Sequence, residues 1–575
     1  MRFVIALALT LGLVSLASAA DWPQWLGANR NGSTTEKVAP WKGDLKKVWH
    51  IAVGEGHSSP IVAGGLVYLH TKIEKKDAEL VQAFDAKTGE MKWEQSYERP
   101  KFSTLFGDGP RATPCVHDGK LYTFGITGTL ACWEAATGNP QWKTDVLDDA
   151  KKENLYFGVS ASPLVVGDYV VIQGGNGSAK GLKAFDRKSG KLAWTAGTDA
   201  PSYAAPVVFG REIVALTGDH LKAISQFGEL IWEYPFGDKL AGNSTTPIKV
   251  GDLYIAASVR AGAVAVKIVE KDGKATPEVA WTNRQLTCYF STPVAVDIEH
   301  LYMVTGTMAE NPSVTLRCVV AATGEEVWNK PKVGKYHAAL LRMGDGNLLM
   351  HDDVSGDLCL LAPNPKQYGE LARSKACGPT WAHPAVANGM VFVRDNKELV
   401  ALSLVERAAD VSNEKVAVRL LPVFDYFVRV AKEDPERVTA DNTAIVDALK
   451  KDVELQNVTK ILVNEKALSN EELGDTIAFV WLGYRKKNKF GDGVIQISDV
   501  TDRLRKAVLV RFKSDPDKAK FKIDGVDCGE TPKSLGLNRD EEYLITAVVD
   551  GHEQFERKDY SPKASDVVMM KMKKK

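Results

Sequence analysis

Residues 83–93 read AFDAKTGEMKW, in which a short apolar segment is followed by a Thr-Gly turn and then by a tryptophan. The same pattern recurs as CWEAATGNPQW at 132–142, AFDRKSGKLAW at 184–194 and CVVAATGEEVW at 318–328, with looser copies ending at Trp232 and Trp281. Self-similarity at a fixed period is the sequence signature of a repeat architecture. This repeat therefore decides the fold class.

The other half of the repeat is a small residue, then usually a proline, then an apolar strand. Eight copies of this segment are present. The proline, or the residue in its place, is at positions 60, 114, 163, 206, 247, 293, 338 and 384. The mean spacing is about 46 residues, which is the size of a four-stranded propeller blade. Each unit contains short alternating apolar runs separated by Gly, Asp or Asn turns. We therefore predict an all-β eight-bladed propeller over residues 21–405.

The two ends of the repeat region suggest how the ring closes. Residues 46–49 read KKVW and match the end of a unit, although they precede the first opening. The eighth unit, which opens at Pro384, lacks a tryptophan strand of its own. We predict that the strand containing Trp49 completes the eighth blade. The tryptophans are expected to fill the wedges between blades, because radial packing buries both faces of each sheet.

The N-terminus predicts export. Arg2 precedes an apolar run at 3–16 and small residues at 17–20. This order is typical of a secretory signal peptide, here residues 1–20, so we expect a secreted or periplasmic protein. No later segment is long and apolar enough to span a bilayer. The 73 basic and 73 acidic residues balance, and this argues against a nucleic-acid partner.

Chemistry-bearing residues form no pattern that predicts catalysis. The seven cysteines include no adjacent pair and no C-x-x-C motif. Cys132, Cys318 and Cys359 take the place of an alanine in other repeats, so we expect them to pack as small apolar side chains. None of the ten histidines has the i, i+4 spacing of a helical zinc site. We predict no catalytic and no metal-binding residues.

The channel mouth is the candidate binding site. Residues three positions before each proline should line the mouth, because the first strand of a blade lies innermost. These residues are His57, Arg111, Ser160, Tyr203, Ser244, Phe290, Lys335 and Trp381. The aromatic and basic members, His57, Arg111, Tyr203, Phe290, Lys335 and Trp381, suit an anionic or ring-shaped ligand. The alternative is that the same residues merely line a solvent-filled opening.

The AFDxxTGxxxW repeat resembles that of the quinoprotein-like (PQQ-like repeat) propeller family, over residues 21–405. That family includes quinoprotein alcohol dehydrogenases and the outer-membrane assembly propeller lipoprotein. The dehydrogenase branch implies pyrroloquinoline quinone (PQQ), a calcium ion and a pair of adjacent bridged cysteines, and this chain lacks the adjacent cysteines. The lipoprotein branch implies a platform for other envelope proteins. We therefore expect no cofactor.

The C-terminal third departs from the repeat. Residues 406–507 predict a small mixed α/β domain, with helical spacing at 416–432 and 444–453 and strands or buried segments at 461–463 and 477–481. The last segment, 508–575, resembles the PEGA domain, a small β-sandwich, through its Asp-Gly hairpin and Gly-x-Thr-Pro turn. That resemblance implies adhesion or assembly at a cell surface.

Taken together, these observations predict a non-catalytic interaction scaffold that binds envelope or extracellular proteins through its propeller. Two alternatives stay open. One is a PQQ-dependent oxidoreductase, and the other is a module that binds a glycan or another small ligand at the channel.

Overall fold

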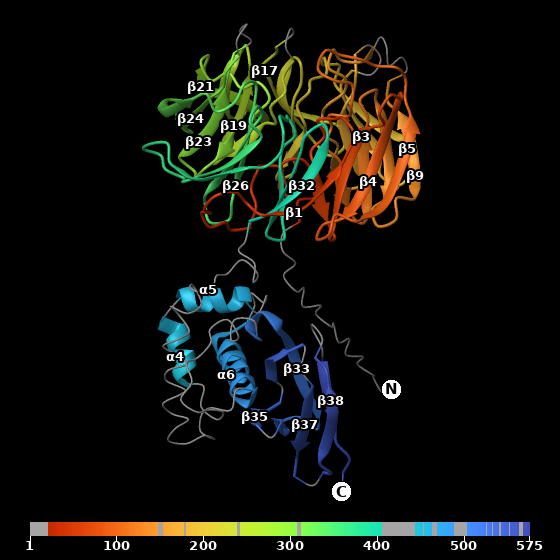
Figure 1. Cartoon of the computed structure of the whole chain (residues 1–575). Helices are drawn as coiled ribbons and strands as arrows, with labels where there is room; N and C mark the ends of the chain where they lie inside the picture. The colour runs from red at the N-terminus through yellow and green to blue at the C-terminus, as the bar shows by residue number, and fades with distance from the viewer. Residues whose placement is uncertain are drawn as a thin grey trace, which may run out of the picture. The chain divides into compact units, whose positions relative to one another are not determined.

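The computed structural model describes residues 21–147, 153–176, 180–238, 242–307, 312–404, 443–451, 453–462, 468–487, 503–524, 526–531, 533–539, 542–550, 552–562 and 567–574. The chain forms two compact units, Met1–Val405 and Glu406–Lys575, and each is considered by itself (Figure 1). The predicted signal peptide lies outside the described residues and stays a prediction.

The first unit is an eight-bladed β-propeller made of eight four-stranded antiparallel sheets (Figure 1). First strands of neighbouring blades, such as β2 and β30, approach each other and line the axis. Blades 1–4 consist of β2 Ile61–Ala63, β3 Leu66–Lys72, β4 Ala78–Asp85 and β5 Met91–Glu98; β6 Cys115–His117, β7 Lys120–Phe124, β8 Thr129–Glu134 and β9 Pro140–Asp145; β10 Leu164–Val166, β11 Tyr169–Gln173, β12 Leu182–Asp186 and β13 Leu192–Ala196; β14 Val207–Phe209, β15 Glu212–Leu216, β16 His220–Ile224 and β17 Leu230–Pro235.

Blades 5–7 follow the same consecutive order. They consist of β18 Ile248–Val250, β19 Leu253–Ser258, β20 Gly262–Lys271 and β21 Lys274–Asn283; β22 Val294–Ala295, β23 His300–Thr305, β24 Thr315–Val320 and β25 Glu326–Pro331; β26 Ala338–Arg342, β27 Leu348–Asp352, β28 Asp357–Leu361 and β29 Glu370–Lys375.

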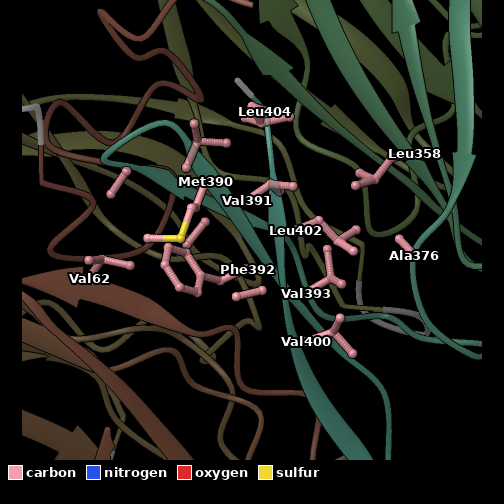
Figure 2. Close-up of a cluster of buried hydrophobic side chains, with 14 of the residues drawn as sticks. Val62, Leu358, Ala376, Met390, Val391, Phe392, Val393, Val400, Leu402 and Leu404 are labelled. Atoms are coloured by element: carbon pink, nitrogen blue, oxygen red, sulfur yellow. The ribbon is translucent and has the colours of Figure 1, made fainter. Parts of the chain in front are cut away.

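Blade 8 closes the ring. It combines β30 Ala385–Ala387, β31 Met390–Arg394 and β32 Glu398–Ser403 with β1 Lys47–Ala52, the first strand of the chain. Trp49 pairs with Ala401 and His50 with Val400, which confirms the predicted closure. Figure 2 shows the apolar side chains of β31 and β32 in this blade, with Val62 of β2 on one side and Leu358 of β28 on the other.

The Thr-Gly turn of one blade holds the tryptophan of the blade before it. Gly138 has φ +74°, and a Cβ atom there would lie 2.5 Å from the Trp93 ring. The Trp93 Nε1–H donates to the Ala135 carbonyl at 2.8 Å. The arrangement repeats for Trp142 with Gly190, Trp194 with Gly228, Trp281 with Gly324 and Trp49 with Gly89. The repeat therefore encodes a link between blades, as expected.

The cysteines pack as predicted. Cys132, Cys318 and Cys359 lie buried in β8, β24 and β28, and all seven cysteines are buried and outside any disulfide. Cys132 pairs with Trp142, and Cys318 pairs with Trp328, on the neighbouring strand of the same sheet.

An N-terminal strap, residues 21–45, crosses one end of the propeller (red in Figure 1). Trp22 exchanges two backbone hydrogen bonds with Val62 of blade 1, at 2.8 and 2.9 Å. Ser33 forms a parallel bridge with Arg342 of blade 7. The Trp41 Nε1–H donates to the Arg373 carbonyl in the same blade at 3.2 Å. The repeat pattern does not predict the strap, because the strap precedes the first unit.

The second unit contains three described helices, α4 Thr443–Lys451, α5 Val453–Leu462 and α6 Asn470–Lys487. Residues 477–481, for which a strand or a buried segment was predicted, lie inside α6. Leu473, Ile477 and Val480 recur at helical spacing and are buried, so the strand alternative is wrong. The predicted helix at 416–432 lies outside the described residues. None of the helices in the described residues is long and apolar enough to cross a membrane.

The C-terminal strands form two sheets that share one buried cluster, which includes Phe512, Phe521 and Tyr543. The strands are β33 Ala507–Asp515, β34 Lys520–Ile523, β35 Val526–Glu530, β36 Lys533–Asn538, β37 Tyr543–Val548, β38 Phe555–Tyr560 and β39 Val567–Lys571. The assignment of this region to a PEGA-like sandwich, and of 406–507 to an α/β domain, stays a prediction.

Candidate functional site

One axial cavity of about 110 Å³ is lined by residues from seven of the eight blades. Its lining is Trp25, His57, Arg111, Phe157, Ser160, Ser162, Tyr203, Ala205, Ser244, Phe290, Trp381 and His383. Five of the six predicted ligand-binding residues are therefore brought together. The sixth, Lys335, lies outside the lining and is exposed, with its Nζ 5.0 Å from the centroid of the Tyr336 ring.

Aromatic side chains close one end of this cavity. The Trp381 ring stacks on His57, with centroids 4.9 Å apart, and contacts Phe290 at 5.2 Å. Because these residues come from blades 8, 1 and 6, the indole reaches across the mouth. Phe106 contacts both Trp381 and Phe157, at 5.7 and 5.5 Å. We call Phe106, Phe157, Tyr203, Phe290 and Trp381 the aromatic rim.

Arg111 holds two rim loops together. Its Nε–H donates to the Phe157 carbonyl at 2.6 Å, and its Nη2 donates to the carbonyls of Phe106 and Gly107 at 3.2 and 3.1 Å. Burial lowers the pKa of Arg111 to about 10, so the guanidinium stays charged at neutral pH. Within the described residues, no carboxylate forms an ion pair with it. Arg111 therefore both orders the rim and leaves a positive charge beside it.

The His57 ring is held by a backbone carbonyl of the rim. Its Nε2–H donates to the Phe106 carbonyl at 3.0 Å. Burial, reinforced by the charges of Arg111 and Arg394, lowers the pKa of His57 to about 3. The ring is thus neutral at physiological pH, and its role is to stack on Trp381.

The strap closes the other end of the axial cavity. The Trp25 Nε1–H donates to Thr246 Oγ1 at 2.8 Å, and the Trp25 ring lies 4.5 Å from that of His383. His383 is 3% exposed, and burial lowers its pKa to about 3. The cavity therefore lies between the strap and the aromatic rim.

The hydroxyl residues that precede the prolines connect neighbouring blades. The Ser59 N–H donates to Thr113 Oγ1 at 3.2 Å, and the Thr113 N–H donates to Ser162 Oγ at 2.9 Å. The His383 N–H donates to Ser59 Oγ at 2.9 Å, which carries the chain of bonds across the closure. The small polar residue of the repeat thus has a structural role.

A larger side cavity, of about 690 Å³, adjoins the aromatic rim at blades 3–6. Its lining includes four aromatic residues (Tyr156, Phe157, Tyr203 and Tyr289) and polar residues such as Asn176, Asp219 and Asp238. Burial raises the pKa of Tyr203 to about 12, so its phenol stays neutral. The repeat pattern does not predict this cavity, because the walls of the cavity are loops between the repeated strands.

Two large apolar side chains beside the rim face solvent. Leu105 is 90% exposed and Tyr156 is 66% exposed. Leu105 precedes Phe106, and the Tyr156 ring packs edge-on against Phe157 with centroids 4.8 Å apart. The rim is therefore flanked by two exposed apolar side chains.

Several known proteins share sequence with the propeller. A family model described as outer membrane protein assembly factor BamB matches residues 32–105 and 77–330. A quinohemoprotein alcohol dehydrogenase (ADH-IIG) of Pseudomonas putida is 30% identical over 144 residues, 24% of this chain and 19% of that protein. The outer membrane protein assembly factor BamB of Yersinia pestis is 25% identical over 249 residues, 39% of this chain and 58% of that protein.

The chain therefore spans less than two thirds of either relative. Among solved structures, BamB from Moraxella catarrhalis aligns with a TM-score of 0.45 at 15% identity, over 62% of this chain and 97% of that one.

Proposed function

Because the chain belongs to the family whose model is described as outer membrane protein assembly factor BamB, we propose that it is a non-catalytic scaffold that binds other proteins of the cell envelope or the extracellular space. In this proposal the protein is exported, as its N-terminus predicts. The propeller supplies a rigid ring, and the aromatic rim with Leu105 and Tyr156 is the contact surface.

The observation that carries this proposal is the composition of that surface. Aromatic residues and arginine are enriched at the cores of protein interfaces, and a few of them carry most of the binding energy. Here Arg111 lines the axial cavity together with four aromatic side chains of the rim. Exposed Leu105 and Tyr156 extend it outward. Exposed apolar patches of this kind mark interaction sites.

The alternative quinone-dependent oxidation does not fit the residues present. The axial cavity, about 110 Å³, is below the lower end, about 300 Å³, of ordinary ligand pockets. Trp381 and Phe290 occupy its mouth. No disulfide joins any of the seven cysteines, and the described residues include no group of three or more His, Cys, Asp or Glu side chains that could hold a metal.

The test is photo-crosslinking in cells that produce the protein. A photoreactive amino acid at Leu105 should yield discrete crosslinked proteins, which mass spectrometry identifies. The control is Ile298, which is 74% exposed in the turn between β22 and β23 and therefore lies at the opposite end of a blade. Double substitution Leu105→Asp and Tyr156→Asp should weaken binding of the purified partner at least tenfold. Identical crosslinks from both positions would count against the proposal.

The side cavity favours a second candidate, recognition of a neutral glycan. Sugars stack on aromatic rings and hydrogen-bond to amides and carboxylates, and the cavity offers both within about 690 Å³. Titration calorimetry with a panel of neutral oligosaccharides should detect binding that Tyr156→Ala abolishes. Phe227→Ala, at a residue that is 62% exposed and outside the cavity, should leave binding unchanged. Failure of every oligosaccharide at millimolar concentration would remove this candidate.

A further inference from the structure

A third cavity, of about 780 Å³, lies between the N-terminal strap and the propeller. Its walls come from strap residues such as Arg30 and Asn31, and from residues within or just after the innermost strands, such as Val166, Phe209 and Lys249. The rim residues precede those same strands. The strap cavity therefore opens at the opposite end of the propeller from the aromatic rim.

We propose that the strap cavity binds a small organic anion that carries a carboxylate or phosphate group. The proposal is independent of the protein-binding role of the rim, because the two sites share no lining residue. Three cationic side chains, Arg30, Lys249 and Arg342, line the cavity, and its lining includes no aspartate or glutamate.

Arg30 is a buried cation without a countercharge. It is 2% exposed, its Nη1 donates to the Pro163 carbonyl at 2.8 Å, and its Nη2 donates to the Ser162 carbonyl at 3.0 Å. Its Nε is buried without a hydrogen-bond partner, and it forms no ion pair with the described residues. A buried charge is costly unless it is paired. An anion in the adjoining cavity would supply the missing charge.

Arg342 is the side chain placed to make the direct contact. Its backbone is fixed, because its N–H donates to the Gly32 carbonyl at 2.7 Å and its carbonyl accepts from the Thr34 N–H at 3.0 Å. Its guanidinium has no hydrogen bond or ion pair with the described residues, and its Nε is buried without a partner. Guanidinium groups bind carboxylate and phosphate through two parallel hydrogen bonds. Unsatisfied buried donors need such an explanation.

Lys249 is already engaged and is expected to play a lesser part. Its Nζ donates to the Tyr254 hydroxyl at 2.8 Å, and that hydroxyl donates to Glu212 at 2.5 Å. The Lys249 ammonium group is therefore engaged with Tyr254 and, through that hydroxyl, with Glu212, so it is less available to a ligand in the cavity.

The size and the apolar wall indicate an organic ligand. The cavity, about 780 Å³, is within the range of about 300–1,000 Å³ that holds small molecules. Leu164, Val166 and Phe209 form an apolar stretch of the lining beside the cations. An inorganic ion would leave this wall unused, whereas a ligand with an apolar body and an anionic head would contact both parts.

The test uses the full chain and titration calorimetry with phenyl phosphate and benzoate, and with phenol as the matched neutral compound. We expect at least one anion to bind, phenol not to bind, and added NaCl to weaken binding. Arg342→Gln should weaken binding at least tenfold, Arg342→Lys less so, and Arg260→Gln, at an exposed residue outside the lining, not at all.

Three results would overturn the proposal: no binding of either anion at millimolar concentration, equal binding by wild type and Arg342→Gln, or inorganic phosphate binding as tightly as phenyl phosphate. If Arg342→Gln does not fold, the salt dependence of wild-type binding and the Arg342→Lys variant still decide the matter.

Discussion

Glu79 illustrates how single side chains stabilise the ring away from the axis. It is fully buried, accepts a hydrogen bond from the Tyr97 hydroxyl, and lies 3.0 Å from His70 Nε2. Its other oxygen accepts the Ile126 N–H of the next blade at 3.0 Å. A Cβ atom on Gly125 would lie 2.4 Å from this carboxylate, so glycine is required there. The cluster therefore ties blade 1 to blade 2.

Substitution Glu79→Gln should destabilise the protein in a pH-dependent way. Burial alone would raise the pKa of Glu79, but His70 and the hydrogen bonds outweigh it and hold the pKa below the ordinary 4.5. The carboxylate thus stabilises the fold fully above pH 4.5, and this contribution is lost as pH falls through the lowered pKa. We expect a loss of about 3 kcal/mol at pH 7, which shrinks below pH 4.5, measured by urea unfolding.

The control for this experiment is Glu98→Gln, because Glu98 is exposed on the same blade. Its unfolding free energy should match that of wild type across the pH range. A wild-type advantage over Glu79→Gln that stays constant from pH 7 to acid would contradict the assignment.

Residue spacing predicted much of the candidate site, for a physical reason. Every innermost strand begins at the same height in the ring, so residues three positions before the proline meet around the axis. Lys335 does not line the axial cavity, for two reasons. Its blade lacks the proline, and Asp353 accepts the N–H groups of Lys335 and Tyr336, at 2.7 and 3.0 Å. As a result Tyr336, rather than Lys335, contacts Trp381. Whether the rim residues bind a ligand stays a prediction.

At the scale of elements, the Thr-Gly turn and the tryptophan strand form the joint between blades. Substitution Gly138→Ala should cost about 2–4 kcal/mol, because alanine is strained at positive φ and its Cβ would collide with Trp93. Chemical unfolding followed by tryptophan fluorescence measures the loss.

The variant Gly64→Ala separates the cost of backbone strain from the cost of the collision with tryptophan. Gly64 also has positive φ, +58°, but a Cβ there meets nothing within 4 Å. It should cost only about 1 kcal/mol, from backbone strain alone. Equal losses for the two variants would show that the tryptophan contact contributes nothing.

Elements outside the repeat could not be predicted. The strap precedes the first repeat, and the loops that carry Phe106 and Phe157 lie between repeated strands, so the period of the repeat holds no information on these segments. In the second unit, α6 mixes β-branched and aromatic residues, which suit strands, and the helix is settled by burial of Leu473, Ile477 and Val480 on one face. Local composition therefore favoured a strand, whereas packing favoured the helix.

At the scale of the whole molecule, burial should make every thiol unreactive. Burial raises the pKa of Cys115 to about 11 and that of Cys132 to about 12. Since the thiolate is the reactive form, a thiol reagent such as DTNB should label essentially none of the native protein and all seven cysteines in guanidinium. Ser96→Cys, at an exposed position of β5, should add one thiol that reacts in the native state. Rapid native labelling of wild type would contradict the buried cysteine positions.

The closing of blade 8 by β1 has a consequence for how the protein is made. β1 leaves the ribosome early, yet its hydrogen-bonding partner β32 lies about 350 residues later in the sequence, and pairings this distant form slowly. A nascent chain that stops short of residue 398 cannot complete the circle, however many blades it has built. Closure of the ring is therefore delayed until synthesis has passed β32. Under the proposal that the protein is exported, this delay would leave the unclosed chain time to be threaded through a translocation pore.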